Sequence, residues 1–234
     1  MKVFVRYLGL IHYAQSLARM RAFVDSRDFH TPDELWCLEH PSVFTQGQGG
    51  RATHVHDTGD IPIVQSDRGG QVTYHGPGQL VVYILMDLRR QGLGPRELVR
   101  RIETGILALL DDFGIDAARR PGAPGVYAND AKIAALGLRI RRGTSYHGLA
   151  LNVDLDLEPF RRIDPCGFKG LEVTRLKDFG IKMNCNSVAE RLLPQLVTAL
   201  YEDKQAIEID YLSIDERQQQ RAHHAGKVGR AVNG

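Results

Sequence analysis

Hydrophobic and polar positions along the chain predict both strands and helices. Residues 2–8 alternate, with Val3, Val5 and Tyr7 on one side, as in a half-buried strand. Several other short apolar segments are bounded by turn-forming residues. We therefore predict further strands over residues 34–39, 71–74, 79–88, 132–140 and 145–157.

Two turns predict which of these strands are neighbours. The segment His75-Gly76-Pro77-Gly78 separates the strands at 71–74 and 79–88, which predicts a hairpin. The segment at 141–144, Arg-Arg-Gly-Thr, joins the last two strands in the same way.

Three segments repeat hydrophobic residues at helical spacing instead. The first is a short stripe of Leu17, Met20, Phe23 and Val24. In the second, Pro95 suits the first helical turn, and apolar residues then recur every three or four positions. These residues are Leu98, Ile102, Ile106, Leu109 and Phe113.

The third helix is predicted from Ser187 and Glu190, whose spacing indicates a capping box. Its stripe continues through Val188, Leu192, Leu196 and Leu200. Pro194 lies within this stripe and should kink the helix.

The order of these elements predicts the fold class. Strands in adjacent meanders with a few helices differ from the regular alternation of a doubly wound sheet. We expect an α+β fold, with a mixed, mostly antiparallel sheet covered by helices. Residues 1–210 are expected to form a single catalytic domain, and the polar residues 211–234 a flexible tail.

Composition excludes several classes of protein. The 234 residues are 43% hydrophobic and 25% charged, which allows a real core and rules out wholesale disorder. Three cysteines are too few for a disulfide framework and suggest a reducing compartment. A net charge of +2 argues against a general nucleic-acid binder.

No membrane segment or signal peptide is expected. Arg6 interrupts the apolar run at the N-terminus. The longest uncharged apolar run, residues 80–86, is seven residues long, against the roughly 20 that a spanning helix needs. We therefore expect a soluble cytoplasmic protein.

Common cofactor and metal motifs are missing from the sequence. It contains no GxxxxGK[ST] phosphate loop and no GxGxxG dinucleotide fingerprint. The segments Cys37-Leu38-Glu39-His40 and His54-Val55-His56 contain metal-ligand types, but no further pair completes a tetrahedral set. We interpret the two histidines of the second segment as exposed loop residues, and expect no metal.

Two segments have the composition of a functional site. Residues 68–78 hold four glycines and a proline, so the main chain can approach a ligand closely. In the second, Cys166 lies between Pro165 and Gly167, which places it on a loop. Arg161, Arg162 and Lys169 lie nearby in sequence, and positive charge favours the thiolate form of a cysteine.

Four segments together resemble the octanoyltransferase family, also called lipoyl(octanoyl) transferases. They are RGGQVTYHGPGQL at 68–80, KIAALG at 132–137, HGLALN at 147–152 and DPCG at 164–167. The likeness is collinear, spans roughly residues 1 to 200 and shows no departure at the catalytic positions. It implies the fold of the biotin and lipoate protein ligases.

The resemblance also implies an activity and its partners. Members of this family transfer an octanoyl group from octanoyl-acyl carrier protein to a lysine of lipoyl domains, the first step of lipoate synthesis on the protein. The acceptors implied are the lipoyl domains of 2-oxoacid dehydrogenase complexes and the glycine cleavage H protein. No cofactor is implied, because a thioester converts to an amide downhill.

The same resemblance assigns roles to single residues. The nucleophile that carries the acyl thioester falls on Cys166, and the lysine that lowers its pKa falls on Lys132. The family's substrate contacts fall on Arg68, Gly69, Gly70, Gln71, Val72, Thr73, Tyr74, His75, Ala135, Leu136, Gly137, Gly148, Leu149 and Ala150. We also expect His75 and His147 to line the substrate cavity, and main-chain N–H groups near Cys166 or in residues 68–75 to stabilise the oxyanion.

Two other functions compete with this interpretation. An ATP-dependent lipoate or biotin ligase of the same fold would activate a free acid and would not need Cys166. A non-enzymatic carrier or nucleic-acid-binding module would instead use the arginine pairs at 89–90, 100–101, 119–120 and 141–142. In an acyltransferase, these pairs could form a docking face for acidic protein partners.

Overall fold

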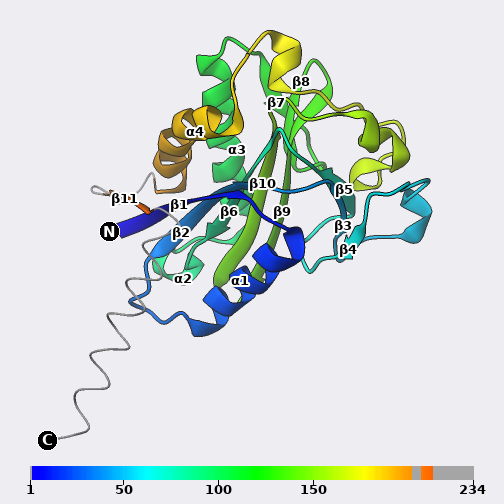
Figure 1. Cartoon of the computed structure of the whole chain (residues 1–234). Helices are drawn as coiled ribbons and strands as arrows, with labels where there is room; N and C mark the ends of the chain where they lie inside the picture. Colours follow the sequence, from blue (N-terminus) through cyan, green and yellow to red (C-terminus); the bar gives the residue numbers. More distant parts are fainter. Residues whose placement is uncertain (1, 202–206, 213–234) are drawn as a thin grey trace, which may run out of the picture.

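The computed structural model describes residues 2–201 and 207–212, apart from the side chains of Cys166 and Leu212. Figure 1 shows a large sheet with helices on both faces and a smaller sheet beside it. Within the described residues, the large sheet has eight strands in the order β11-β1-β2-β6-β10-β9-β8-β7. These strands are β1 (Lys2–Leu10), β2 (Asp33–Glu39), β6 (Gln79–Leu85), β7 (Ala117–Arg119), β8 (Gly125–Ala128), β9 (Ala131–Arg141), β10 (Thr144–Asn152) and β11 (Glu208–Leu212).

The large sheet is mixed and mostly antiparallel. Strand β1 runs parallel to both β11 and β2, whereas the remaining neighbours are antiparallel. The β9–β10 hairpin forms around the turn predicted at 141–144. The α+β class and the kind of sheet predicted from the sequence are therefore confirmed.

Helices cover both faces of this sheet. On one face lies α1 (Tyr13–Ser26), and on the other lie α3 (Pro95–Asp112) and α4 (Cys185–Leu200), while α2 (Leu88–Gln91) is a single short turn after β6. Strand β6 shows why both layers form, because its alternate residues enter different cores. Val82 packs with the α3 and α4 side, and Tyr83 packs with the α1 side.

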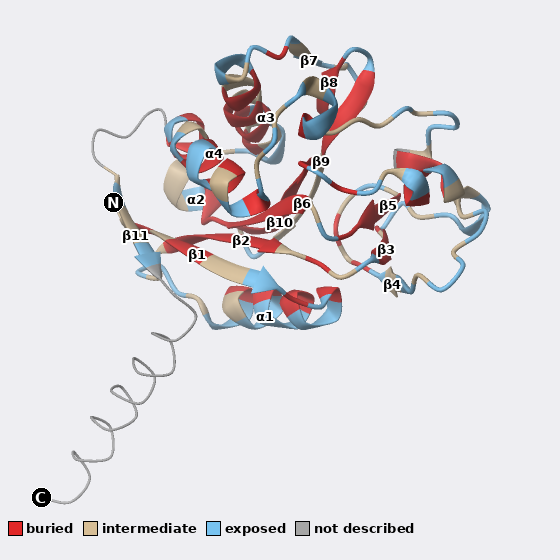
Figure 2. Cartoon of the chain, turned by 45° about the horizontal axis from the view of Figure 1, so that its top comes forward, coloured by how far each residue is buried: buried red, intermediate tan, exposed pale blue. Residues whose placement is uncertain are grey.

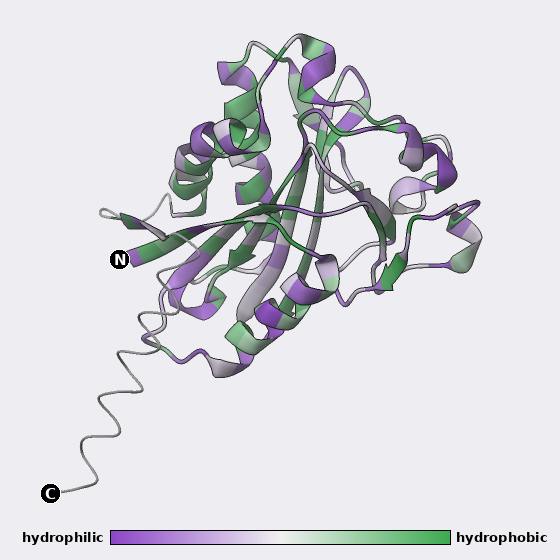
Figure 3. Cartoon of the chain, viewed as in Figure 1, coloured by the Kyte–Doolittle hydropathy of each residue, from purple (hydrophilic) through white to green (hydrophobic). Residues whose placement is uncertain are grey.

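Burial and hydropathy follow this layering. In Figure 2 the central strands are buried, while the helices are buried only where they face the sheet. Figure 3 shows the same division, with hydrophobic strands at the centre and hydrophilic outer surfaces on α1 and α4. Since β6 is covered on both faces, its uninterrupted apolar run is explained.

The smaller sheet corrects one expectation. It has the order β4 (Ile63–Gln65), β3 (Val43–Gln46) and β5 (Val72–His75). The predicted hairpin of residues 71–74 with residues 79–88 is therefore wrong, since β5 and β6 belong to different sheets. Val72 and Tyr74 pack into a separate small core with Phe44 and Phe160, which draws β5 away from β6.

The predicted ends of three helices or strands also differ from the structure. Strand β6 stops at Leu85 because Asp87 caps α2, and β10 stops at Asn152. The predicted capping box at Ser187 is wrong, because α4 begins earlier and Asn184 is its cap. The Asn184 side chain accepts a hydrogen bond from the Ser187 N–H at 2.9 Å. The helix continues through Pro194.

Short 3-10 helices connect the layers near the smaller sheet. They are η1 (Ala52–His54), η2 (Glu158–Arg162), η3 (Pro165–Gly167) and η4 (Leu176–Phe179). Of the tail expected from residue 211, residues 213–234 lie outside the described part of the chain, and residues 211 and 212 end β11. None of the described helices is long and apolar enough to cross a membrane.

Candidate active site

Small residues on adjacent strands open a cavity in the face of the large sheet. Gly148 and Ala150 of β10 lie opposite Gly137 and Ala135 of β9, and Gly148 also lies opposite Tyr83 of β6. These residues line a cavity that opens to solvent. Glycine and alanine leave space here that larger side chains would fill, so the strand register itself creates the cavity.

Strand β5 and the glycine segment before it form the opposite wall. Thr73 and His75 line the cavity, whereas Val72 and Tyr74 point to the other side of the strand. The structure thus brings most of the expected substrate contacts to one cavity, with Gly69, Val72 and Tyr74 outside its lining. Those that line it are Arg68, Gly70, Gln71, Thr73, His75, Ala135, Leu136, Gly137, Gly148, Leu149 and Ala150.

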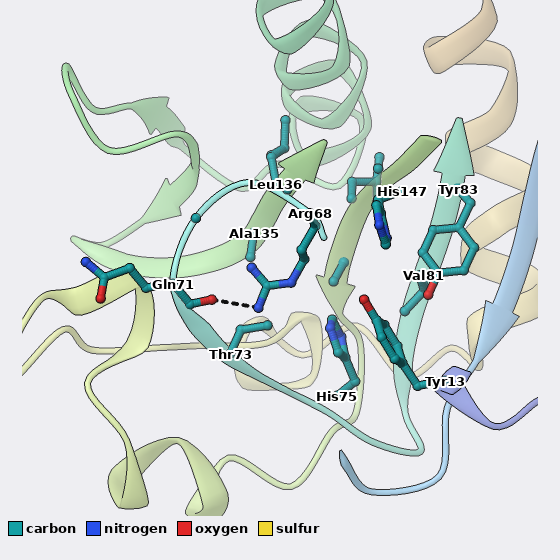
Figure 4. Close-up of a pocket in the computed structure, with 15 residues that line it drawn as sticks. Tyr13, Arg68, Gln71, Thr73, His75, Val81, Tyr83, Ala135, Leu136 and His147 are labelled. Carbon is teal, nitrogen blue, oxygen red and sulfur yellow. Dashed lines mark hydrogen bonds between the residues drawn. The ribbon is translucent and has the colours of Figure 1, made fainter. Parts of the chain in front are cut away.

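Arg68 fixes the shape of the glycine segment. Its side chain is buried, and Nη2 donates to the carbonyls of Thr45 at 2.6 Å and Gln71 at 2.7 Å. Figure 4 shows the second of these bonds across the cavity wall. A Cβ atom on Gly47 would lie 2.4 Å from the Gly70 carbonyl oxygen. The loop that follows β3 at Gly47 and the glycine segment before β5 therefore pack backbone against backbone.

Aromatic and imidazole rings close one end of the cavity. The rings of His75 and His147 both stack against Tyr13, with centroids 5.9 and 6.5 Å apart. Figure 4 shows these three side chains together with Tyr83. Burial lowers the pKa of both histidines, so each imidazole is neutral near pH 7. His75 and His147 both line this cavity, and its role as the substrate cavity stays a prediction.

Three lining residues are not predicted from the sequence. Val81 and Tyr83 lie two residues apart on β6, so their side chains share one face of the strand. Once β10 is known to be the neighbouring strand, this face is the one that lines the cavity. Tyr13 comes from the start of α1, and no local pattern connects it with the cavity. Only the docking of α1 on the sheet brings it there.

Lys132 lies at a second, smaller cavity that adjoins the first. It is buried, its Nζ donates to the Pro124 carbonyl at 3.2 Å, and Nζ lies 5.2 Å from the centre of the Tyr127 ring. The register of β8 and β9 shifts beside Lys132. Such a bulge changes the direction of a strand's side chains.

The turn that contains Cys166 reaches the same small cavity. Lys132 and Pro165 both line it, and Thr73 and Ala135 line both cavities. Cys166 is the middle residue of η3, and the position of its side chain lies outside what the structure describes. The fold therefore brings the backbone of the Cys166 turn beside Lys132, although 34 residues separate them in sequence.

The other two cysteines are poor candidates for a nucleophile. Cys37 and Cys185 are both buried. Burial raises the pKa of the Cys37 thiol to about 12 and also raises the pKa of Cys185. Both thiols therefore stay protonated near neutral pH, when only the thiolate attacks a carbonyl.

The arginine pairs are held by nearby acids. In every pair at least one arginine has a carboxylate partner: Arg90 with Asp33, Arg100 with Glu97, Arg119 with Glu103, and Arg141 with Asp25. Much of their charge is thus locally compensated, and a docking face built from them stays a prediction. Among the described residues, no group of three His, Cys, Asp or Glu side chains is arranged to hold a metal ion.

Comparison with known proteins identifies the family of this chain. Residues 12–197 match the family model of the lipoyl protein ligase A/B catalytic domain. The octanoyltransferase of Pseudomonas putida (strain W619) is 58% identical over 195 residues, which cover 83% of this chain and 91% of that protein. The octanoyltransferase of Stutzerimonas stutzeri (strain A1501) is 57% identical over 196 residues, covering 84% and 90%.

Solved structures share the fold at low sequence identity. The crystal structure of lipoate-protein ligase A bound with ATP has a TM-score of 0.76 at 18% identity, covering 96% of this chain and 94% of that one. A biotin protein ligase from Aquifex aeolicus has a TM-score of 0.52 at 11% identity, covering 88% and 72%. The fold and cavity thus define a catalytic domain of the lipoyl protein ligase A/B type. Within this class, the chain belongs to the octanoyltransferase family and is an acyltransferase.

Proposed function

We propose that this protein transfers an octanoyl group from octanoyl-acyl carrier protein to a lysine of a lipoyl domain, through a thioester on Cys166. One observation supports this most directly. Lys132 and the Pro165 end of the Cys166 turn line one small cavity, which shares Thr73 and Ala135 with the larger cavity. An acyl chain in the larger cavity would thus present its carbonyl end to the two proposed catalytic residues.

The reaction would take place in two balanced steps. In the first, the Cys166 thiolate attacks the donor thioester, a new carbon–sulfur bond forms as the old one breaks, and the carrier leaves as a thiolate that takes a proton from Lys132 or from water. In the second, the acceptor amine attacks this thioester, an amide bond forms, and the Cys166 thiolate is regenerated. The amine loses its proton to water or to Lys132, which is neutral if it protonated the carrier thiolate in the first step, and no ATP is consumed.

Lys132 would favour the thiolate during the first step. A thiol with a pKa of about 8.5 is only about 3% ionised at pH 7, so full ionisation increases the reactive population about 30-fold. A cation about 4 Å away supplies the roughly 2 kcal/mol that this requires, even at an effective dielectric constant near 20. Part of the gain is lost, because a less basic thiolate is a weaker nucleophile.

The cavity walls would select the acyl chain. The cavity has an apolar surface made by Ala135, Gly137, Gly148 and Ala150. The stacked rings of Tyr13 and His75 close one end of the cavity. The proposed acceptors are lipoyl domains of 2-oxoacid dehydrogenase complexes and the glycine cleavage H protein, in the first step of lipoate synthesis. We place the reaction in the cytoplasm, since a reactive thiol needs a reducing compartment.

Intact mass spectrometry tests this function. After incubation with octanoyl-acyl carrier protein and no ATP, we expect one added octanoyl group that hydroxylamine removes. Cys166→Ser should lack this group, whereas Cys185→Ala, a change at a buried thiol, should retain it. Wild-type protein without the adduct would overturn the proposal, and so would ATP-dependent activity that survives in Cys166→Ser, which would indicate a ligase.

A further inference from the structure

Two histidines far from Cys166 in sequence form hydrogen bonds with Asp164, the residue that precedes the Cys166 turn. His54 Nδ1 lies 3.2 Å from Asp164 Oδ2, and His56 Nε2 lies 2.9 Å from Asp164 Oδ1. Each carboxylate oxygen therefore has its own imidazole. Hydrogen bonds from His56 and His54 lower the pKa of Asp164, so the carboxylate stays ionised. His56 is half exposed, but His54 is mostly covered, and neither is a free loop residue.

Backbone pairing supports these side-chain contacts. Val55 and Ile163 form an antiparallel bridge, and the Asp164 N–H donates to the His54 carbonyl at 2.8 Å. The His56 N–H donates to the Arg162 carbonyl at 2.9 Å. The segment around His54 is thus attached directly in front of η3 through both main chain and side chains.

Asp164 is well placed to control the orientation of the Cys166 turn. Its carbonyl accepts the Gly167 N–H at 2.9 Å, which closes the turn around Cys166. The next residue, Pro165, has no N–H to anchor the chain. After the turn, Phe168 is about half exposed, and its N–H donates to the Pro165 carbonyl at 3.1 Å.

The other end of this loop is attached at Lys132. The Lys132 N–H donates to the Glu172 carbonyl at 2.8 Å, and the Lys132 carbonyl accepts the Thr174 N–H at 3.0 Å. The loop therefore has one anchor at Lys132 and another at Asp164, with the Cys166 turn directly beside the second anchor. Losing either anchor would widen the range of positions that the turn can adopt.

We propose that His54 and His56 are positioning residues, which clamp Asp164 and thereby hold the Cys166 turn in register with Lys132. We refer to His54, His56 and Asp164 as the Asp164 clamp. This role rests on the proposed function, since it concerns the approach of Cys166 to an acyl carbonyl. A displacement of about 1 Å can cost about 100-fold in rate, so a hydrogen-bonded clamp outside the cavity can matter for catalysis.

The geometry favours a clamp over a metal site. The histidine nitrogens lie at hydrogen-bond distance from the carboxylate oxygens, so the three groups already satisfy one another. No three-residue metal cluster occurs among the residues that the structure describes. A chelator should therefore leave the acylation rate unchanged.

Matched substitutions distinguish an effect of the clamp on the acylation rate from a general loss of stability. His54→Leu and His56→Leu remove the nitrogens that face Asp164. His54→Asn and His56→Gln keep an amide N–H close to the positions of Nδ1 and Nε2. We expect each leucine variant to slow single-turnover acylation of Cys166 about 10-fold or more, and each amide variant to recover to within about 3-fold of wild type. Thermal unfolding then shows whether all variants are folded.

A double-mutant cycle tests whether the histidines act through Asp164. In an Asp164→Ala background, His54→Leu should cause little further loss. The clamp is wrong if the leucine variants acylate at the wild-type rate, if the amide variants fail to recover, or if the losses multiply in the Asp164→Ala background. A rate that falls on chelation would indicate a metal and also overturn it.

The outcome can be distinguished from a failure of the proposed function. Wild-type protein that forms no octanoyl adduct would overturn the function itself. The clamp is then still tested by the rate at which iodoacetamide alkylates Cys166 in the same set of variants, with the same order of rates expected. An order unrelated to the hydrogen-bonding groups would overturn it.

Discussion

Lys132 of β9 and Val173 form an isolated parallel β-bridge. The pairing uses only backbone atoms, with the Lys132 N–H and carbonyl bonded to either side of Val173. It attaches the loop that follows the Cys166 turn to the strand that carries the lysine. A substitution of the Lys132 side chain should therefore leave this backbone attachment in place.

Removing the lysine side chain should make the Cys166 thiol harder to ionise. In Lys132→Ala, we expect the pH midpoint of Cys166 alkylation to rise by one unit or more, with reactivity at pH 7 falling up to about 30-fold. Lys132→Arg keeps the charge and should shift the midpoint less. The exposed Lys182, outside the loop that contains Cys166, gives the control Lys182→Ala, expected to match wild type. An unchanged profile in Lys132→Ala would remove this lysine from the mechanism.

A larger residue on the sheet face should shorten the acyl chain that the enzyme accepts. Ala150 lines the cavity, so Ala150→Leu should fill part of it. We expect octanoyl transfer to fall about 15-fold or more, the cost of leaving two methylenes unburied, while shorter chains lose less. The relative transfer of butanoyl, hexanoyl and octanoyl groups measures this. Ala18→Leu, on an exposed position of α1, should leave the ratio as in wild type, and an unchanged ratio in Ala150→Leu would show that the chain binds elsewhere.

Acid should destabilise the protein through its buried histidines. Burial lowers the pKa of His40 from 6.5 to about 4. Between these values the unfolded chain binds more protons, so the free energy of unfolding rises with pH across this window. Neutral His40 contributes about 3 kcal/mol to the free energy of unfolding. This contribution is fully present above pH 6.5 and is lost as the pH falls towards 4.

Urea unfolding measured from pH 4 to 7 checks this slope. His40→Gln has no titrating ring and should show a shallower dependence on pH. His30→Gln, at an exposed position, is the matched control and should follow wild type. If both variants have the wild-type slope, acid unfolding must originate at other groups.

The start of α4 offers a test of the corrected helix cap. Asn184 accepts the Ser187 N–H, so Asn184→Ala should lower the free energy of unfolding by about 1 kcal/mol. Ser187→Ala should change it by less than about 0.5 kcal/mol, since this side chain is not the cap. Chemical denaturation of both variants measures the difference. A larger loss in Ser187→Ala than in Asn184→Ala would support the capping box predicted from the sequence.

Local patterns in the sequence were enough for most elements and for the family. The stripe from Leu98 to Phe113 and the alternation after Lys2 correspond to α3 and β1. The glycine-rich segment and the Pro165-Cys166-Gly167 motif indicated the family, because a short run of special residues needs no knowledge of the fold. These signals are local, since periodicity and turn chemistry act over a few residues.

The tertiary structure decided which of these segments meet. The sequence predicted that β5 pairs with β6, but the small core around Phe44 placed β5 in another sheet. Tyr13 reaches the cavity only because α1 docks on the sheet, and His54 reaches Asp164 across more than a hundred residues. Such contacts depend on how whole layers pack and on which strands pair, and neither is encoded in the pattern of any single segment.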